Sequence, residues 1–309
     1  MMTDFSLAAE DYLATRRAMG YKFREQGRLL RQFVAHLEMV GAEHLTINDA
    51  VSWAKEPADG AMTWWAFRLG VCRQFARYLS TIDPATEVPP TGLFPEPSHR
   101  IVPYIYSDDD LLGLLEAAGR LTPEHRADTY QTLISLVAVT GMRNGEAVRL
   151  NDDDVDLGDG ILTIRNSKFG KSRQVPIHPS AVAALTGYAR RRDHRRPRPK
   201  SRSFFTSTTG TRLLRDNVST VYPRLVSDAG LRPGPSGRQA RLHDLRHTFA
   251  VKCVIGWYRA GVDVDARLPV LSTYLGHTSP RDTFWYLTGV PELLELAAER
   301  LDTAPEVLP

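Results

Sequence analysis

Residues 242–250 of this 309-residue chain read LHDLRHTFA, and this stretch is the best starting point for both fold and chemistry. His243, Arg246 and His247 stand at the start of an apolar-periodic segment that predicts a helix over residues 244–260. His243 and His247 are four residues apart, so both imidazoles lie on one face of that helix. The helix start therefore offers side chains that suit a metal ion or a phosphate.

Two upstream segments carry further cations. TGMRNGEAVRL, residues 140–150, places Arg143 on a tight turn before a short helix that contains Glu146. KFGKS places Lys168 and Lys171 in the loop between two predicted strands, ILTIRNS and RQVPI. The chain has only six lysines against 33 arginines, so two lysines in one loop make that loop a candidate site.

A downstream segment adds an imidazole and a phenol. LSTYLGHTSPRDTFWYL, residues 271–287, supplies His277 and, nine residues later, Tyr286. Tyr274 lies one helical turn before His277 within the apolar pattern, so we expect it to be packed. Each of these residues alone would be read as a surface or core side chain, and only their order along the chain is informative.

The apolar pattern predicts a mainly helical fold with a small β-sheet. In the N-terminal part, helical spacing covers residues 5–18, 22–40, 46–55 and 61–81. After the linker, Ser107 and the three aspartates that follow it predict the N-cap and first turn of a helix that continues through LLGLLEAAGRL. Further helices are predicted over 124–140, 180–190, 213–228, 244–260, 265–275 and 291–301. Six prolines between Asp83 and Pro103 predict an extended linker. We therefore expect a helical domain at 1–83, a linker at 84–103 and a second domain at 104–309.

Composition is that of an ordinary globular protein, with 42% apolar and 24% charged residues. No apolar run approaches the roughly 18 to 20 residues of a membrane span. The first residues lack the basic and apolar regions of a secretory signal, and the two cysteines, Cys72 and Cys253, suggest no disulfide framework. We expect a cytoplasmic protein without a membrane partner.

The net charge of +3 is unevenly distributed, with 28 basic and 24 acidic residues after residue 100. The run RRRDHRRPRPKSR, Arg190 to Arg202, has eight basic residues and one acid. Such a run is either a solvated face or mobile loop, or a loop that contacts phosphates.

The order Arg, Lys, His-x-x-Arg, His, Tyr resembles the catalytic domain of tyrosine recombinases, the lambda-integrase and Xer-like family. TGMRNGE resembles the first arginine motif of the family, HDLRHTFA its His-x-x-Arg box and LGH its second histidine box. The resemblance extends over the whole chain, because the family also carries an N-terminal helical core-binding domain that binds DNA. LPVLSTYLGH looks like the form found in transposon-borne recombinases.

The resemblance implies an active site of six side chains: Arg143, Lys168, His243, Arg246, His277 and Tyr286. Tyr286 would attack a DNA phosphodiester and hold the 3′-phosphate. The two arginines and His277 would stabilise the charge that develops on the phosphate, and His243 would assist proton movement. Lys168 would protonate the departing 5′-oxygen, although Lys171 in the same loop is also a candidate.

The implied partner is double-stranded DNA with inverted-repeat core sites, bound by a homo- or hetero-tetramer in the cytoplasm, at the nucleoid. No cofactor and no metal are expected, because fixed positive charge takes the place of a metal ion. The amphipathic tail at 291–301 either packs on its own domain or, as the family favours, docks into a neighbouring subunit.

Two other functions fit parts of the sequence. A DNA-binding accessory recombinase would have the same fold without cleavage. A zinc hydrolase would use the two histidines of HDLRH, but Asp244 replaces the glutamate of H-E-x-x-H and Arg246 would put a cation beside the metal. That second function also leaves Arg143 and Tyr286 without a role.

Overall fold

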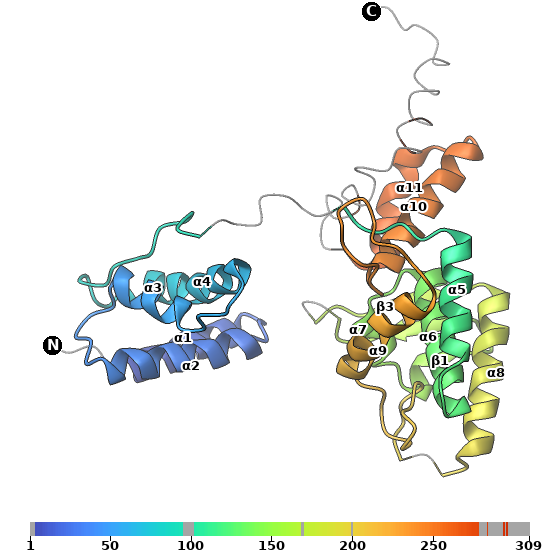
Figure 1. Ribbon diagram of the computed structural model, residues 1–309, viewed down its shortest axis with the longest axis horizontal. Coiled ribbons are helices and arrows are strands. Elements are labelled where there is room, and N and C mark those ends of the chain that lie inside the picture. The colour runs from blue at the N-terminus through green and yellow to red at the C-terminus, as the bar shows by residue number, and fades with distance from the viewer. Residues whose placement is uncertain are drawn as a thin grey trace, which may run out of the picture. The chain divides into compact units, whose positions relative to one another are not determined.

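The computed structural model describes residues 4–94, 102–167, 170–198, 200–277, 283, 293 and 295. The chain divides into two compact units, Met1–Arg100 and Ile101–Pro309. Most of the elements are labelled in Figure 1, and the described part of the chain is mainly helical with one small antiparallel sheet, as the sequence predicts.

Residues 4–94 of the N-terminal unit form a bundle of four helices, α1 Phe5–Ala18, α2 Arg24–Met39, α3 Ile47–Lys55 and α4 Met62–Leu79. Asp4 caps α1 by accepting a hydrogen bond from the amide of Leu7, and Thr46 and Asp49 form a capping box at the start of α3. The apolar stripes meet in a core that includes Leu13, Phe33 and other fully buried side chains. The aromatic side chains of this core serve packing.

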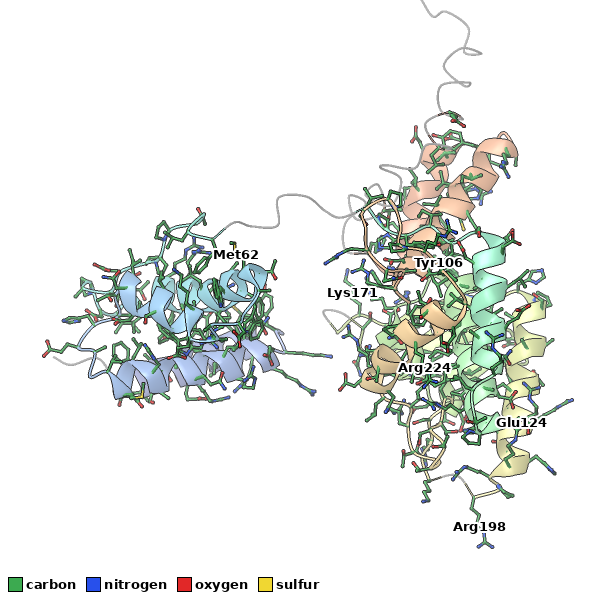
Figure 2. The ribbon with its side chains drawn as sticks, in the orientation of Figure 1. Met62, Tyr106, Glu124, Lys171, Arg198 and Arg224 are labelled. Atoms are coloured by element: carbon green, nitrogen blue, oxygen red, sulfur yellow. The ribbon has the colours of Figure 1, made fainter. Side chains whose placement is uncertain are left out.

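The C-terminal unit contains eight helices among its described residues. They are α5 Asp108–Gly119, α6 Glu124–Thr140, α7 Asn144–Ala147, the 3-10 turn Asp152–Asp154, α8 Pro179–Arg195, α9 Arg215–Asp228, α10 Asp244–Arg259 and α11 Val264–Leu275. Their apolar faces and the sheet enclose one large core, and a smaller cluster lies between α10 and α11. Tyr106, labelled in Figure 2, fastens the segment before α5 to this core through hydrogen bonds to Tyr222, at 2.9 Å, and to the Arg241 carbonyl, at 3.0 Å.

The sheet has three strands in the order β1 Val155–Asp156, β2 Ile161–Ile164 and β3 Arg173–Pro176. β2 and β3 form the predicted hairpin, in which Ile164 pairs with Arg173 and Ile161 with Pro176. β1 adds a third strand that the sequence analysis missed, because two residues are too short to display an alternating pattern.

Helix α8 is longer than predicted and takes up the first part of the basic run. Its last turns are held by ion pairs to carboxylates far away in sequence: Arg191 to Asp128 at 3.1 Å, and Arg192 to Asp152 at 2.7 Å. Arg192 is buried and also donates to the Phe204 carbonyl at 2.7 Å. Residues 190–195 are therefore part of a helix and not of a mobile loop, and the buried guanidinium of Arg192 stabilises the fold instead of facing a phosphate.

Leu293 is buried with the apolar side chains of α10 and α11. The remainder of the predicted tail helix, apart from Glu295, lies outside the described residues, as do Lys168 and Tyr286. In the part of the chain that the structure describes, no helix has the length and apolarity needed to cross a membrane.

Candidate active site

Arg143 is held at the junction of α6 and α7. α6 ends at Thr140 and its C-cap is Gly141, whose φ of +59° is left-handed and where a Cβ atom would lie 2.5 Å from the Phe249 ring, so glycine is required. The chain then turns and Arg143 becomes the N-cap of α7. Its guanidinium donates to the Gly276 carbonyl at 3.0 Å, and its side chain remains 27% exposed. Arg143 therefore faces both the end of α11 and the solvent.

Arg246 lies on the first turn of α10 and is fully buried. Its two terminal nitrogens donate to the carbonyls of Gly141, at 2.8 Å, and Leu275, at 2.9 Å. A buried guanidinium is stable only when its donors are satisfied, and these bonds fix its plane. Arg246 thus joins the end of α6 to the end of α11.

A third arginine, Arg173 of β3, completes this arrangement. Its Nε donates to the Tyr274 carbonyl at 2.8 Å. Three consecutive carbonyls, those of Tyr274, Leu275 and Gly276, therefore each accept a hydrogen bond from a different arginine. The last carbonyls of a helix lack intrahelical partners and form the negative end of its dipole, so cations are favoured there.

Glu146 is a buried carboxylate in contact with two of these arginines. It accepts hydrogen bonds from Arg143 Nη1 at 2.9 Å, from Arg173 Nη2 at 2.8 Å and from Ser167 Oγ at 2.6 Å. Burial alone would raise its pKa, but the bonds from Arg173 and Ser167 outweigh burial and lower the pKa to about 2. Glu146 is therefore charged at neutral pH and partly balances two arginines.

Three histidines lie within the field of the arginines. The rings of His243 and His247 meet edge to face, with centroids 5.2 Å apart, and His277 Nδ1 lies 2.7 Å from Thr283 Oγ1. Burial, followed by the charge of Arg246, lowers the pKa of His277 to about 3. The same two causes lower the pKa of His243 to about 4, although part of this side chain faces solvent. Both imidazoles are therefore neutral at pH 7.

The hairpin loop is closed at its base. Ser167 is buried, its amide donates to the Lys171 carbonyl at 2.8 Å, and its carbonyl accepts from the Gly170 amide at 3.1 Å. Lys171 is exposed and is labelled in Figure 2. Because Lys168 lies outside the described residues, the choice between the two lysines stays open.

Tyr274 is packed, as expected from its place in the apolar pattern. Its ring stacks on Phe249 with centroids 5.8 Å apart, and its hydroxyl donates to the Pro176 carbonyl at 3.3 Å. Burial raises the pKa of this phenol to about 12, which disfavours the phenolate. Tyr274 is therefore a poor nucleophile, while the other candidate, Tyr286, lies outside the described residues.

Four of the six predicted site residues thus come together: Arg143, His243, Arg246 and His277. Sequence reasoning missed the supporting residues Arg173, Ser167 and Thr283. It noted Glu146 without a role, although a glutamate three residues after a turn arginine is a signal for a local ion pair. Among the described residues, no group of three or more histidine, cysteine, aspartate or glutamate side chains is arranged to hold a metal ion.

Comparison with known proteins finds that residues 107–290 match the Phage integrase family. A putative integrase/recombinase of Sinorhizobium fredii, y4rB, is 43% identical over 97% of this chain and 98% of its own length. The tyrosine recombinase XerD of Mycobacterium tuberculosis is 34% identical over 72% of this chain and 67% of its own length.

Three solved structures have a similar fold. The XerA recombinase superposes with a TM-score of 0.54 at 22% identity and covers 99% of this chain and 100% of its own. The Tn1549 transposon integrase in complex with transposon right end DNA gives 0.65 at 15% identity, over 96% and 99% of the two chains. A lambda integrase tetramer bound to a Holliday junction gives 0.62 at 17% identity, over 91% and 76%.

Proposed function

The chain belongs to the Phage integrase family, that of the tyrosine recombinases, and we propose that it cuts DNA one strand at a time with Tyr286 as its nucleophile. As a member of this family it is a site-specific recombinase that breaks and rejoins DNA strands. The assignment of residues is carried by one observation, the meeting of Arg143, Arg246 and His277 at the C-terminal end of α11.

The proposed reaction conserves the energy of the phosphodiester. The Tyr286 oxygen attacks the phosphorus while His243 assists the removal of its hydroxyl proton, the bond from phosphorus to the 5′-oxygen breaks, and a 3′-phosphotyrosine forms. Lys168 gives its proton to the departing 5′-oxygen, with Lys171 as the alternative donor. The 5′-hydroxyl of another strand then attacks the phosphotyrosine, releases Tyr286 and completes strand exchange.

The arginines supply fixed positive charge for this step. Attack builds negative charge on the non-bridging oxygens, and the planar guanidiniums of Arg143 and Arg246 suit paired donation to them. Both are anchored before DNA binds, which supports preorganised stabilisation. His277, neutral at pH 7, adds an uncharged donor, and His243 is assigned to assist proton movement at Tyr286.

The proposed partner is double-stranded DNA with inverted-repeat core sites. The XerH recombinase has been solved on a palindromic substrate, and lambda integrase as a tetramer on a Holliday junction. By analogy, we assign residues 1–83 to DNA binding, 84–103 to a linker and 104–309 to catalysis, within a homo- or hetero-tetramer on DNA. We also propose a transposon-borne setting, which the LPVLSTYLGH motif supports, and a place at the nucleoid, where the proposed DNA substrate lies.

No observation favours either alternative function. A silent accessory protein would bind DNA without forming a covalent adduct, whereas the proposed enzyme forms one on a nicked suicide substrate through Tyr286. A zinc hydrolase would lose activity in EDTA, whereas cleavage that depends on arginine charge continues in it.

A further inference from the structure

Both ends of the loop that carries the candidate lysines contact one carboxylate. Ser167, on the β2 side, donates from Oγ to Glu146 Oε1 at 2.6 Å. Arg173, which begins β3, donates in a fork from Nη1 to Oε1 at 3.1 Å and from Nη2 to Oε2 at 2.8 Å. Both side chains are mostly or fully buried, so solvent screens these bonds weakly.

The same carboxylate holds Arg143. Arg143 donates to Glu146 from its guanidinium at 2.9 Å and from its amide at 3.0 Å. A displacement of Glu146 therefore moves the hairpin loop and the turn of Arg143 together. The charge-assisted fork that Arg173 forms with Glu146 restricts orientation as well as distance.

Arg173 also reaches the turn that carries His277. Its Nε donates to the Tyr274 carbonyl, and a Cβ atom at Gly276 would lie 2.7 Å from its Nη1. The absence of a side chain at Gly276 thus leaves room for the Arg173 guanidinium against this turn. Through three nitrogens Arg173 connects the hairpin, α7 and the end of α11.

We propose that Arg173 and Ser167 are positioning residues that act through Glu146 to fix the lysine loop relative to Arg143 and His277. This inference rests on the proposed function, in which the loop supplies the general acid. A general acid must lie within hydrogen-bond reach of the leaving oxygen, and a misplacement of 1 Å can reduce a rate by about 10²-fold. The clamp of Ser167, Glu146 and Arg173 supplies that restraint.

The test compares cleavage of two suicide substrates, one with the normal 5′-oxygen and one with a 5′-bridging sulfur, which leaves without a proton. The variants are Ser167→Ala, which removes one hydrogen bond, and Arg173→Lys, which keeps a charge but cannot form the fork. There are two matched controls. Ser172→Ala changes an exposed serine of the same hairpin. Arg165→Lys changes an arginine that forms an ion pair with Asp154, at 2.6 Å, and not with Glu146.

We expect Ser167→Ala and Arg173→Lys to cut the oxygen substrate about 10- to 100-fold more slowly and the sulfur substrate at close to the wild-type rate. Ser167→Ala should lower the melting temperature by only a few degrees, because Glu146 keeps its bonds to both arginines, and should leave single-site DNA binding close to wild type. The control variants should cut both substrates normally. We call near-wild-type cleavage of the sulfur substrate by a variant that cuts the oxygen substrate slowly "sulfur rescue". It distinguishes a misplaced general acid from a general loss of structure, which would slow the cleavage of both substrates equally.

Two results overturn the inference. In the first, Lys168→Ala or Lys171→Ala shows sulfur rescue, but Ser167→Ala and Arg173→Lys either cut the oxygen substrate at the wild-type rate or cut both substrates slowly. Only the positioning role is then wrong. If neither lysine variant shows sulfur rescue, the proposed general acid is wrong, and the positioning role falls with it.

Discussion

The guanidinium of Arg246, at the start of α10, donates to the carbonyl of Leu275, the residue that ends α11, at 2.9 Å. This bond places a fixed charge next to the turn of His277, although the two partners are 29 residues apart. Arg143 reaches the next carbonyl from α7. The positive charge of the site is thus built around one helix end.

The first prediction concerns these two arginines. Arg143→Ala and Arg246→Ala should each lower the rate of strand cleavage by about 10²- to 10³-fold, because the transition state loses a preorganised donor. Lysine at either position should restore little, since an ammonium cannot donate in a fork. Single-turnover cleavage with saturating DNA measures this, and near-normal rates for both lysine variants would contradict the assigned role.

The second prediction decides between the lysines. Lys168→Ala should cut the oxygen substrate about 10²- to 10⁴-fold more slowly, the usual range for loss of a general acid, and cut the 5′-bridging sulfur substrate well. Lys171→Ala is the matched control, because it removes the same group from the same loop. The reverse pattern would move the general acid to Lys171.

The third prediction concerns Glu146 and acid stability. Its folded pKa of about 2 is lower than the usual 4.5, so its contribution is complete above pH 4.5 and is lost as the pH falls towards 2. That shift corresponds to about 3 kcal/mol of unfolding free energy. His243 and His277 also make the protein less stable in acid, because their pKa values are about 4 and about 3 in the folded chain and 6.5 in the unfolded chain. As the pH falls below 6.5, the unfolded chain binds protons at these imidazoles before the folded chain does, and the free energy of unfolding decreases.

Glu146→Gln should therefore destabilise the C-terminal unit at pH 7 and flatten the pH dependence of stability only below about pH 4.5. Urea unfolding between pH 3 and 7 measures both effects. Glu116→Gln removes an exposed carboxylate and should change little. Equal stability of Glu146→Gln and wild type at pH 7 would mean that the buried carboxylate is not ionised.

The fourth prediction concerns assembly. Strand exchange on two duplexes needs four cleavages, so one nucleophile is insufficient. Leu293 is buried in the cluster of α10 and α11, and deletion of residues 290–309 uncovers that cluster. If the tail docks into a neighbour, the truncated protein should bind single sites but lose cooperative binding to paired sites and recombination. Normal assembly of the truncated protein in gel-shift assays would mean that the tail packs within its own chain.

Much of the fold was accessible from the sequence, because its helices carry long apolar stripes and clear end signals. The capping box at Ser107 and Asp110 marks the start of α5, as its residues predict. The extension of α8 to Arg195 could not be predicted from the sequence, because its arginines form ion pairs with Asp128 and Asp152. No local sequence pattern indicates ion pairs between residues so far apart in the chain.

The site divides in the same way. The order of basic residues and the tyrosine predicted Arg143, His243, Arg246 and His277 as site residues, and the fold brings these four side chains close together. Arg173 was missed, since in sequence it is one arginine among 33. Its contacts form only when β3 packs beside Glu146 and the end of α11, and no local sequence pattern indicates them.

The central claim is that Tyr286 is the nucleophile, and covalent trapping tests it most directly. Wild-type protein and Tyr274→Phe should both form an adduct on a nicked suicide substrate, visible as a shifted band in a denaturing gel. Tyr286→Phe should bind the same DNA normally and form no adduct, because phenylalanine lacks the attacking oxygen. An adduct with Tyr286→Phe, together with its loss in Tyr274→Phe, would contradict the claim.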